Sequence, residues 1–123
     1  MPFLDRFRRR RTPPQSTTRA DGETIAHLEQ FIATRRGVEG FVEPPTVVSG
    51  ITLLLVARDG EWTRRRVPSA AWAHRFCNDH QTPSYDAAVV GVPQRMREYN
   101  SRVSAEKKAR VLDERRDRDA GPA

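Results

Sequence analysis

The stretch that decides the fold is residues 51–66, "ITLLLVARDGEWTRRR". It begins with a mostly apolar run without alternation, which is typical of a strand that is covered on both faces and is therefore central. Asp59–Gly60 comes next and favours a two-residue hairpin turn, whose central residues both need positive φ. Such a turn places Leu55 opposite Arg64 and Leu54 opposite Arg65. The stretch thus predicts a central strand and an antiparallel partner.

The returning strand carries three consecutive arginines. Trp62, Arg64 and Arg66 share one face of this strand, and Arg65 points to the other. Because both faces receive arginine, we expect an edge strand whose arginine stems cover apolar neighbours while the guanidinium groups stay in solvent. Charged edges discourage aggregation between strands, which is one interpretation. The other is a basic strand that contacts phosphates, with Trp62 as a possible stacking surface.

Upstream of the hairpin, the pattern predicts a helix and then a strand. Asp21 is a suitable N-cap for a helix over residues 22–36, and apolar residues recur at helical spacing within it. A first strand is expected near residues 40–44. Pro44–Pro45 breaks it, and because proline donates no ladder hydrogen bond, we expect this segment at a sheet edge or in a loop.

Downstream of the hairpin, the chain predicts two more helices and one more strand. Ser69 is a suitable N-cap for a helix over residues 69–80. The apolar run that follows predicts a buried strand over residues 85–91. Pro93 marks the first turn of a last helix, whose apolar pattern fades beyond residue 104 into a highly charged extension.

Together these elements predict the α+β class. We expect a small mixed three- to four-stranded sheet with a β-hairpin and three helices, in the order α-β-β-β-α-β-α. A chain of 123 residues suits one domain. The expected organisation is a disordered basic arm over residues 1–21, a single α+β domain over residues 22–104, and a charged helical extension with a frayed tail over residues 105–123.

The net charge of +6 is placed unevenly along the chain. Residues 1–22 carry +4, residues 23–92 carry −1 and residues 93–123 carry +3. A nearly neutral body with two basic arms indicates contact with a polyanion, and solubility alone is the plainer alternative. The stretch "GVPQRMR" adds arginines near a helix N-terminus, which attracts anions. The candidate phosphate contacts are Arg8, Arg9, Arg10, Arg11, Arg64, Arg65, Arg66, Arg95 and Arg97.

These charges favour a non-enzymatic accessory protein that binds nucleic acid, with RNA preferred, through the phosphate backbone. The alternative is an adaptor that binds an acidic protein surface or a membrane surface. For the membrane, Phe3, Leu4 and Phe7 would insert shallowly beside the arginines of residues 1–11. The expected compartment is the cytoplasm, because one cysteine forms no intramolecular disulfide and fits a reducing environment.

No local signature of catalysis or cofactor binding occurs in the chain. We therefore predict no catalytic residue, no cofactor and no metal site. His74, Cys77 and His80 are spaced by three residues, but on a helix they span too wide an angle to meet one zinc ion. A small enzyme would instead need an enclosed polar pocket near Asp86, His74 or Tyr85.

Two stretches, "DGEWTRRRV" (59–67) and "DAAVVGVPQRMREYN" (86–100), resemble segments of small actinobacterial proteins that carry no assigned activity. The resemblance covers the middle half of the chain and implies no function. The α-β-β-β-α order of residues 22–80 is also similar to that of double-stranded-RNA-binding domains. Those domains keep a lysine cluster at the start of the second helix, whereas "VPSAAWAHRF" (67–76) contains no lysine.

Overall fold

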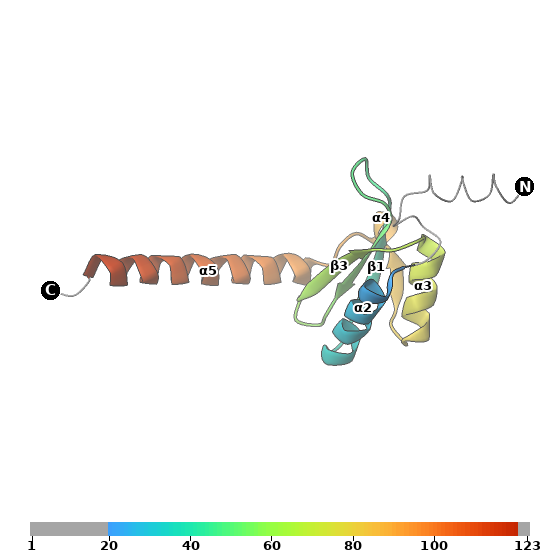
Figure 1. The fold of residues 1–123 in the computed structure, drawn as a ribbon, viewed down its shortest axis with the longest axis horizontal. Coiled ribbons are helices and arrows are strands. Elements are labelled where there is room, and N and C mark those ends of the chain that lie inside the picture. Colours follow the sequence, from blue (N-terminus) through green and yellow to red (C-terminus); the bar gives the residue numbers. More distant parts are fainter. Residues whose placement is uncertain (1–19, 121–123) are drawn as a thin grey trace, which may run out of the picture.

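The computed structural model describes residues 20–120, which form a four-stranded sheet with helices on both faces (Figure 1). The strand order is β3-β2-β1-β4. The strands are β1 (Glu39–Glu43), β2 (Thr52–Val56), β3 (Trp62–Arg66) and β4 (Ser84–Asp86). β2 pairs antiparallel with both β1 and β3, while β4 pairs parallel with β1. The predicted α+β class and mixed sheet are confirmed.

Helices α2 (Gly22–Thr34) and α3 (Ala70–Asp79) cover one face of the sheet. Each begins at the expected cap, because Asp21 accepts a hydrogen bond from the Thr24 amide and Ser69 accepts one from the Trp72 amide. Leu28 of α2 and Cys77 of α3 are fully buried against this face. The larger of the two cores therefore lies between the sheet and these two helices.

The other face carries a smaller core of Phe41, Leu54, Val56 and Met96. It is covered by α4 (Ala87–Val90) and by the first turns of α5 (Gln94–Ala120). Beyond these turns α5 leaves the body and projects away from it, as Figure 1 shows. All its residues from 100 to 120 are exposed. With 27 residues, α5 is about 40 Å long.

The sheet confirms that β2 is central and that β3 is an edge strand. The first strand is found where it was expected, but the edge position was wrong, because β1 lies inside the sheet between β2 and β4. β1 ends at Glu43, so Pro44 and Pro45 fall in the following loop and remove no hydrogen bond from either ladder.

The predicted strand over residues 85–91 was also wrong. β4 ends at Asp86, whose side chain accepts a hydrogen bond from the Ala88 amide at 3.0 Å and so starts the short helix α4. This cap stops the strand before its apolar residues. Val89 and Val90 consequently lie on the surface instead of in the core.

The hairpin turn contains three residues instead of the predicted two. The Gly60 amide donates to the Ala57 carbonyl, and the Ala57 amide donates to the Glu61 carbonyl. Of the two expected residues, only Gly60 takes positive φ, at +95°. This loop shifts the register by one, so Arg64 pairs with Leu54 and not with Leu55. The shift moves Arg64 to the opposite face of β2, because side chains alternate along a strand.

Candidate anion-binding surfaces

Arg64 is held by a carboxylate of the sheet. Its Nε donates to Glu43 Oε1 at 2.7 Å and its Nη2 donates to Glu43 Oε2 at 3.0 Å. Burial alone would raise the pKa of Glu43, but hydrogen bonds from Arg64 and Thr52 outweigh burial and lower it. The guanidinium also lies 5.2 Å from the centre of the Trp62 ring. Arg64 is therefore engaged within the body.

The other two arginines of β3 lie on opposite faces of the sheet. Arg65 points to the α2 side, where it lines a groove together with Asp21 and His27. Arg66 points to the α5 side and is exposed. Within residues 20–120, the Arg66 side chain forms no ion pair or hydrogen bond. The arginine triplet thus does not form one surface.

Trp62 joins the hairpin to the last helix. Its indole Nε1 donates to Asn100 Oδ1 of α5 at 2.7 Å, and its ring packs beside Val56 and Met96. The indole nitrogen is consequently occupied by α5, and the guanidinium of Arg64 lies over the ring. The predicted stacking role of Trp62 remains a prediction, restricted to the ring surface that stays exposed.

The arginines at the start of α5 differ from each other. Arg95 Nε donates to the Ala57 carbonyl at 2.9 Å, and its Nη2 donates to Glu39 Oε1 at 2.7 Å. The Arg95 side chain is only 29% exposed, so it anchors α5 to the sheet. Arg97 is exposed and donates to the Val92 carbonyl at 3.4 Å. The predicted contacts Arg8, Arg9, Arg10 and Arg11 lie outside the described residues.

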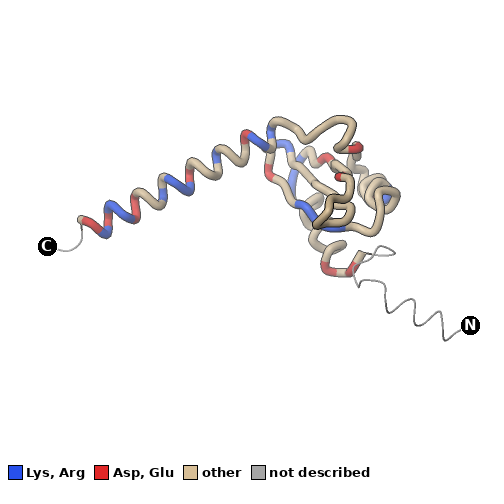
Figure 2. The backbone as a smooth tube through the Cα atoms, turned by 90° about the horizontal axis from the view of Figure 1, so that it is seen from above, with Lys and Arg blue, Asp and Glu red and all other residues tan. Residues whose placement is uncertain are grey.

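A row of basic side chains runs along α5, and of its five members the sequence analysis singled out only Arg97. Figure 2 shows basic and acidic segments alternating along this helix, clear of the body. Helical spacing sorts them, because residues separated by steps of three and four share a face. The basic face of α5 consists of Arg97, Lys107, Lys108, Arg115 and Arg118.

The basic face of α5 also carries Ser104 and Val111 along its middle, and Glu114 and Asp119 border it on either side. Lys107, Lys108 and Arg115 border a shallow groove that contains Val111. The acids Glu106, Asp113 and Asp117 fall on the opposite side of the helix by the same spacing. A helical-wheel analysis of residues 94–120 would have found this face from the sequence.

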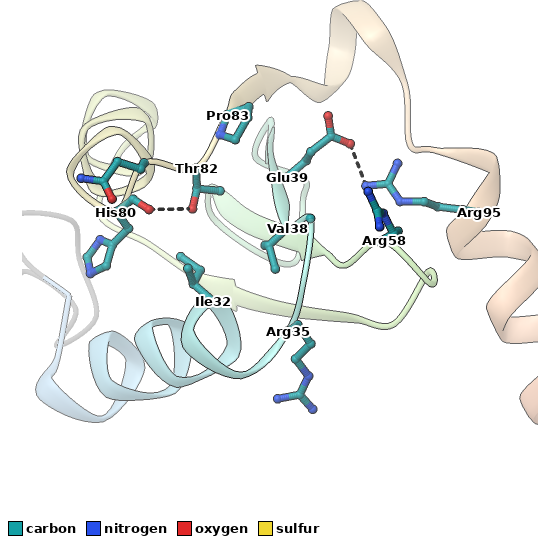
Figure 3. Close-up of a pocket in the computed structure, with 11 residues that line it drawn as sticks. Ile32, Arg35, Val38, Glu39, Arg58, His80, Thr82, Pro83 and Arg95 are labelled. Atoms are coloured by element: carbon teal, nitrogen blue, oxygen red, sulfur yellow. Dashed lines mark hydrogen bonds and ion pairs between the residues drawn. The ribbon is translucent and has the colours of Figure 1, made fainter.

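A cavity of about 600 Å³ opens where β1 begins and β2 ends (Figure 3). The ends of α2 and α3 and the start of α5 complete its wall. Its floor is apolar, with Ile32, Val38 and Pro83, and its charged lining includes Arg58 and Arg95. The cavity lies at the opposite end of β1 from the proline-rich loop.

The nucleophilic and metal-ligating side chains of α3 are occupied within the fold. Burial raises the pKa of the Cys77 thiol to about 11, so the thiolate is scarce at neutral pH. His74 Nδ1 lies 2.7 Å from Ser84 Oγ, and His80 Nε2 lies 3.2 Å from Glu29 Oε2. Within residues 20–120, no three His, Cys, Asp or Glu side chains come together in a metal-binding group.

Comparison with known proteins found no matching family model, no similar curated protein and no similar solved structure. In the part of the chain that the structure describes, no helix has the length and apolar character needed to cross a bilayer.

Proposed function

We propose that this protein is a non-enzymatic cytoplasmic accessory protein that binds nucleic acid through its phosphate backbone, with the basic face of α5 as the main contact. The observation that carries the proposal is the projecting part of α5, residues 100–120 and about 30 Å long, which is exposed throughout and aligns four of the five residues of the basic face. A helix of this kind fits the major groove of B-DNA, and its lysine and arginine side chains reach the flanking phosphates.

Self-association through the same face is less favourable. Pairing of two such helices would use residues spaced alternately by four and three, which here begin at Ser104 and Lys108 and continue through Val111. The next positions are Arg115 and Arg118, so most of the seam would carry positive charge. Repulsion between two copies favours an anionic partner.

The predicted contacts contribute unequally to this proposal. Arg66 supplies an exposed guanidinium on the α5 side of the sheet, but at the end of β3 away from the turn that contacts α5, so it would need a separate phosphate. Arg64 and Arg95 contribute little, because each already binds a glutamate of β1. Arg97 belongs to the basic face of α5 and is retained as a contact. Arg65 faces the α2 side and would need a separate phosphate.

The test is binding to 20-base-pair RNA and DNA duplexes and to single-stranded RNA, measured by fluorescence anisotropy over a range of salt. Four neutralised phosphates give a slope of about −3 to −4 for log K against log salt on duplex DNA. The double variant Lys108→Gln/Arg115→Gln should reduce the steepness by about 2. Tighter binding to RNA than to DNA would support the RNA preference.

A matched control exists on the same helix. Arg110→Gln/Arg116→Gln removes the same charge from the side of α5 that also carries Asp113 and Glu106. It should change the slope by less than about 1. Equal effects of both double variants would show that only net charge matters, and salt-independent binding would remove the proposal.

A second candidate is a peripheral membrane role, which one observation favours. Val47 and Val48 are 104% and 89% exposed at the tip of the loop after β1, and Val89 of α4 is 78% exposed. Because Val42 pairs with Asp86, the loop and α4 leave the sheet at the same end. Such an apolar end can enter a bilayer surface, and residues 1–11 supply further apolar and basic side chains.

Flotation with anionic liposomes separates the two candidates. If the protein binds membranes, Val47→Asp/Val48→Asp and deletion of residues 1–12 should each abolish flotation. Val47→Asp/Val48→Asp should leave the salt slope for nucleic acid unchanged, whereas the deletion also removes Arg8 to Arg11 and should lower its steepness without abolishing binding. Flotation that is unaffected by both changes would exclude this second candidate.

A further inference from the structure

The cavity at the start of β1 has the size of a small-molecule site. Its volume of about 600 Å³ falls within the ordinary range for ligand pockets. Ile32, Val38 and Pro83 give it an apolar side, and side chains that can donate hydrogen bonds lie opposite (Figure 3). An apolar wall with a few fixed polar groups is the usual composition of such sites.

Arg95 is rigidly placed in this wall. Its Nε and Nη2 donate to the carbonyls of Ala57 and Val56, and Nη2 also donates to Glu39 Oε1. The first turn of α5 rests on Gly60 so closely that a Cβ there would lie 2.1 Å from the Arg95 carbonyl oxygen. No acceptor within residues 20–120 binds Arg95 Nη1. This nitrogen therefore keeps its hydrogen-bonding capacity for a ligand.

Arg58 contributes a second guanidinium to the same cavity. Its backbone amide donates to the Arg36 carbonyl at 2.8 Å, which fixes the base of the side chain. Its Cβ fills the space beside Gly37, where an added Cβ would lie 3.1 Å away. Among residues 20–120, no carboxylate or hydrogen-bond acceptor binds its guanidinium. Arg58 is thus held at its base and unoccupied at its tip.

The charges that face the cavity favour an anion. Glu39 is the one carboxylate in the described lining, and both its oxygens are occupied, by Arg95 and by the Tyr85 hydroxyl at 3.2 Å. Arg35 is turned toward Glu61, to which it is paired at 2.6 Å, and points away from Arg95 (Figure 3). Arg58 is consequently a positive charge with no countercharge of its own.

We propose that this cavity binds a small molecule that carries a phosphate or carboxylate group on an apolar body. The anionic group lies between the guanidinium of Arg58 and Nη1 of Arg95, which together offer charge-assisted hydrogen bonds. The apolar body rests on Ile32 and Val38. This inference goes beyond the proposed function, because the cavity shares no residue with the basic face of α5.

The test is a titration of the ¹⁵N-labelled full chain, without nucleic acid, followed by amide chemical shifts. The probes are inorganic phosphate, adenosine 5′-monophosphate and benzoate, with adenosine and benzamide as uncharged counterparts. The anionic probes should shift the amides of Val38, Arg58 and Thr82 and leave those of residues 104–118 unchanged. Tighter binding of the monophosphate than of benzoate assigns phosphate as the anion, and the reverse order assigns carboxylate.

Two substitutions test the roles of the charges. Arg58→Gln should weaken binding of the better anion about tenfold, since it removes a charged hydrogen bond. Arg36→Gln is the matched control, because Arg36 is an exposed neighbour of the cavity that does not line it, and it should change affinity less than twofold. Glu39→Gln should tighten binding, since it removes the like charge beside the anion.

Three outcomes would overturn this inference. They are no shifts at millimolar probe, equal weakening by Arg58→Gln and Arg36→Gln, and shifts of the same size with adenosine as with its monophosphate. Loss of nucleic-acid binding in separate experiments would leave the inference intact, because the titration contains none. Failure here would likewise leave the proposed function untouched.

Discussion

β3 and α5 are both rich in arginine, yet most of the arginines of α5 project freely into solvent while those of β3 lie against the body. On β3, Arg64 is bound by Glu43 and Arg65 faces a groove beside α2, so Arg66 alone is exposed on the α5 side without a described partner. On α5, the basic face lies along a segment in which every side chain from 100 to 120 is exposed. Charge density in a sequence therefore does not measure the charge that a ligand meets.

The difference follows from the geometry of the two elements. A strand lies beside other strands about 5 Å away, so carboxylates of neighbouring strands come within reach of its side chains. The carboxylate that binds Arg64 belongs to β1, on the far side of β2. A helix that projects into solvent has only its own residues as neighbours, and its spacing separates the bases from most of the acids.

Gly60 lies where the hairpin turn meets the first turn of α5, and its substitution should have the largest effect on stability. Gly60→Ala places a methyl group 2.1 Å from the Arg95 carbonyl oxygen and 2.8 Å from Tyr99 Cβ, at a residue with φ of +95°. Either the hairpin or the first turn of α5 must then move. We expect the free energy of unfolding to fall by about 3 kcal/mol or more, measured by urea denaturation.

Gly91→Ala separates backbone strain from collision. Gly91 also has positive φ, at +78°, but a Cβ there meets no atom within 4 Å. Its substitution should cost about 1–3 kcal/mol, because φ of +78° with ψ of 177° is a backbone conformation that essentially only glycine adopts. If both variants lose the same free energy of unfolding, the close contact between α5 and the turn at Gly60 does not contribute to stability.

The second effect concerns the ion pair that binds Arg64 into the sheet. A double-mutant cycle of Arg64→Gln and Glu43→Gln should give a coupling of about 0.5–1 kcal/mol, because the pair is bidentate but the Arg64 side chain is 40% exposed. Arg66→Gln should change stability by less than about 0.5 kcal/mol, since it has no described partner. A coupling near zero would show that Glu43 does not hold Arg64, and Arg64 would then remain a candidate phosphate contact.

The sequence predicted what depends on local patterns. The caps at Asp21 and Ser69, the central apolar strand and the arginine-bearing edge strand all follow from residue chemistry within a few positions, and the structure confirms them. The hairpin register was missed because Asp59–Gly60 is compatible with both two- and three-residue loops. The three-residue loop that the protein adopts puts only Gly60 at positive φ and so avoids strain at Asp59.

The partners of the charged side chains could not be predicted, because they depend on strand order. β4 crosses to the far side of β1, which makes β1 internal and brings Tyr85 to Glu39. The chain fold also brings Arg95 to the same carboxylate from 56 residues away. Spacing along the chain contains no signal for such contacts, so the cavity was missed, whereas the basic face of α5 was within reach of helical spacing.

A smaller effect is expected on the pKa of His27, which lies beside Arg65 on the α2 side of the sheet. Burial lowers the pKa of His27, and the nearby charges of Arg65 and Arg35 lower it further. As pH falls through the ordinary value of 6.5, the unfolded chain takes up a proton more readily than the folded one, so the free energy of unfolding decreases. Arg65→Gln should raise the pKa of His27, as followed by NMR of its ring protons.

The control for that titration is Arg66→Gln. Arg66 lies on the other face of the sheet, so its removal should leave the pKa of His27 unchanged. A rise of similar size with both variants would indicate a long-range effect of net charge. It would also weaken the distinction between the two faces of β3.

The smallest expected effect on stability comes from removing most of α5. A chain that ends at Ser104 lacks the exposed helix but keeps Met96, Tyr99 and the Trp62–Asn100 hydrogen bond. Its free energy of unfolding should stay within about 0.5 kcal/mol of the full chain, because the deleted residues add only solvated helix. Nucleic-acid affinity should nevertheless fall to the level that Arg66 and the N-terminal arginines supply. A loss of stability that depends on protein concentration would show instead that the helix packs against a second copy, and the basic face of α5 would then be an interface within the protein itself.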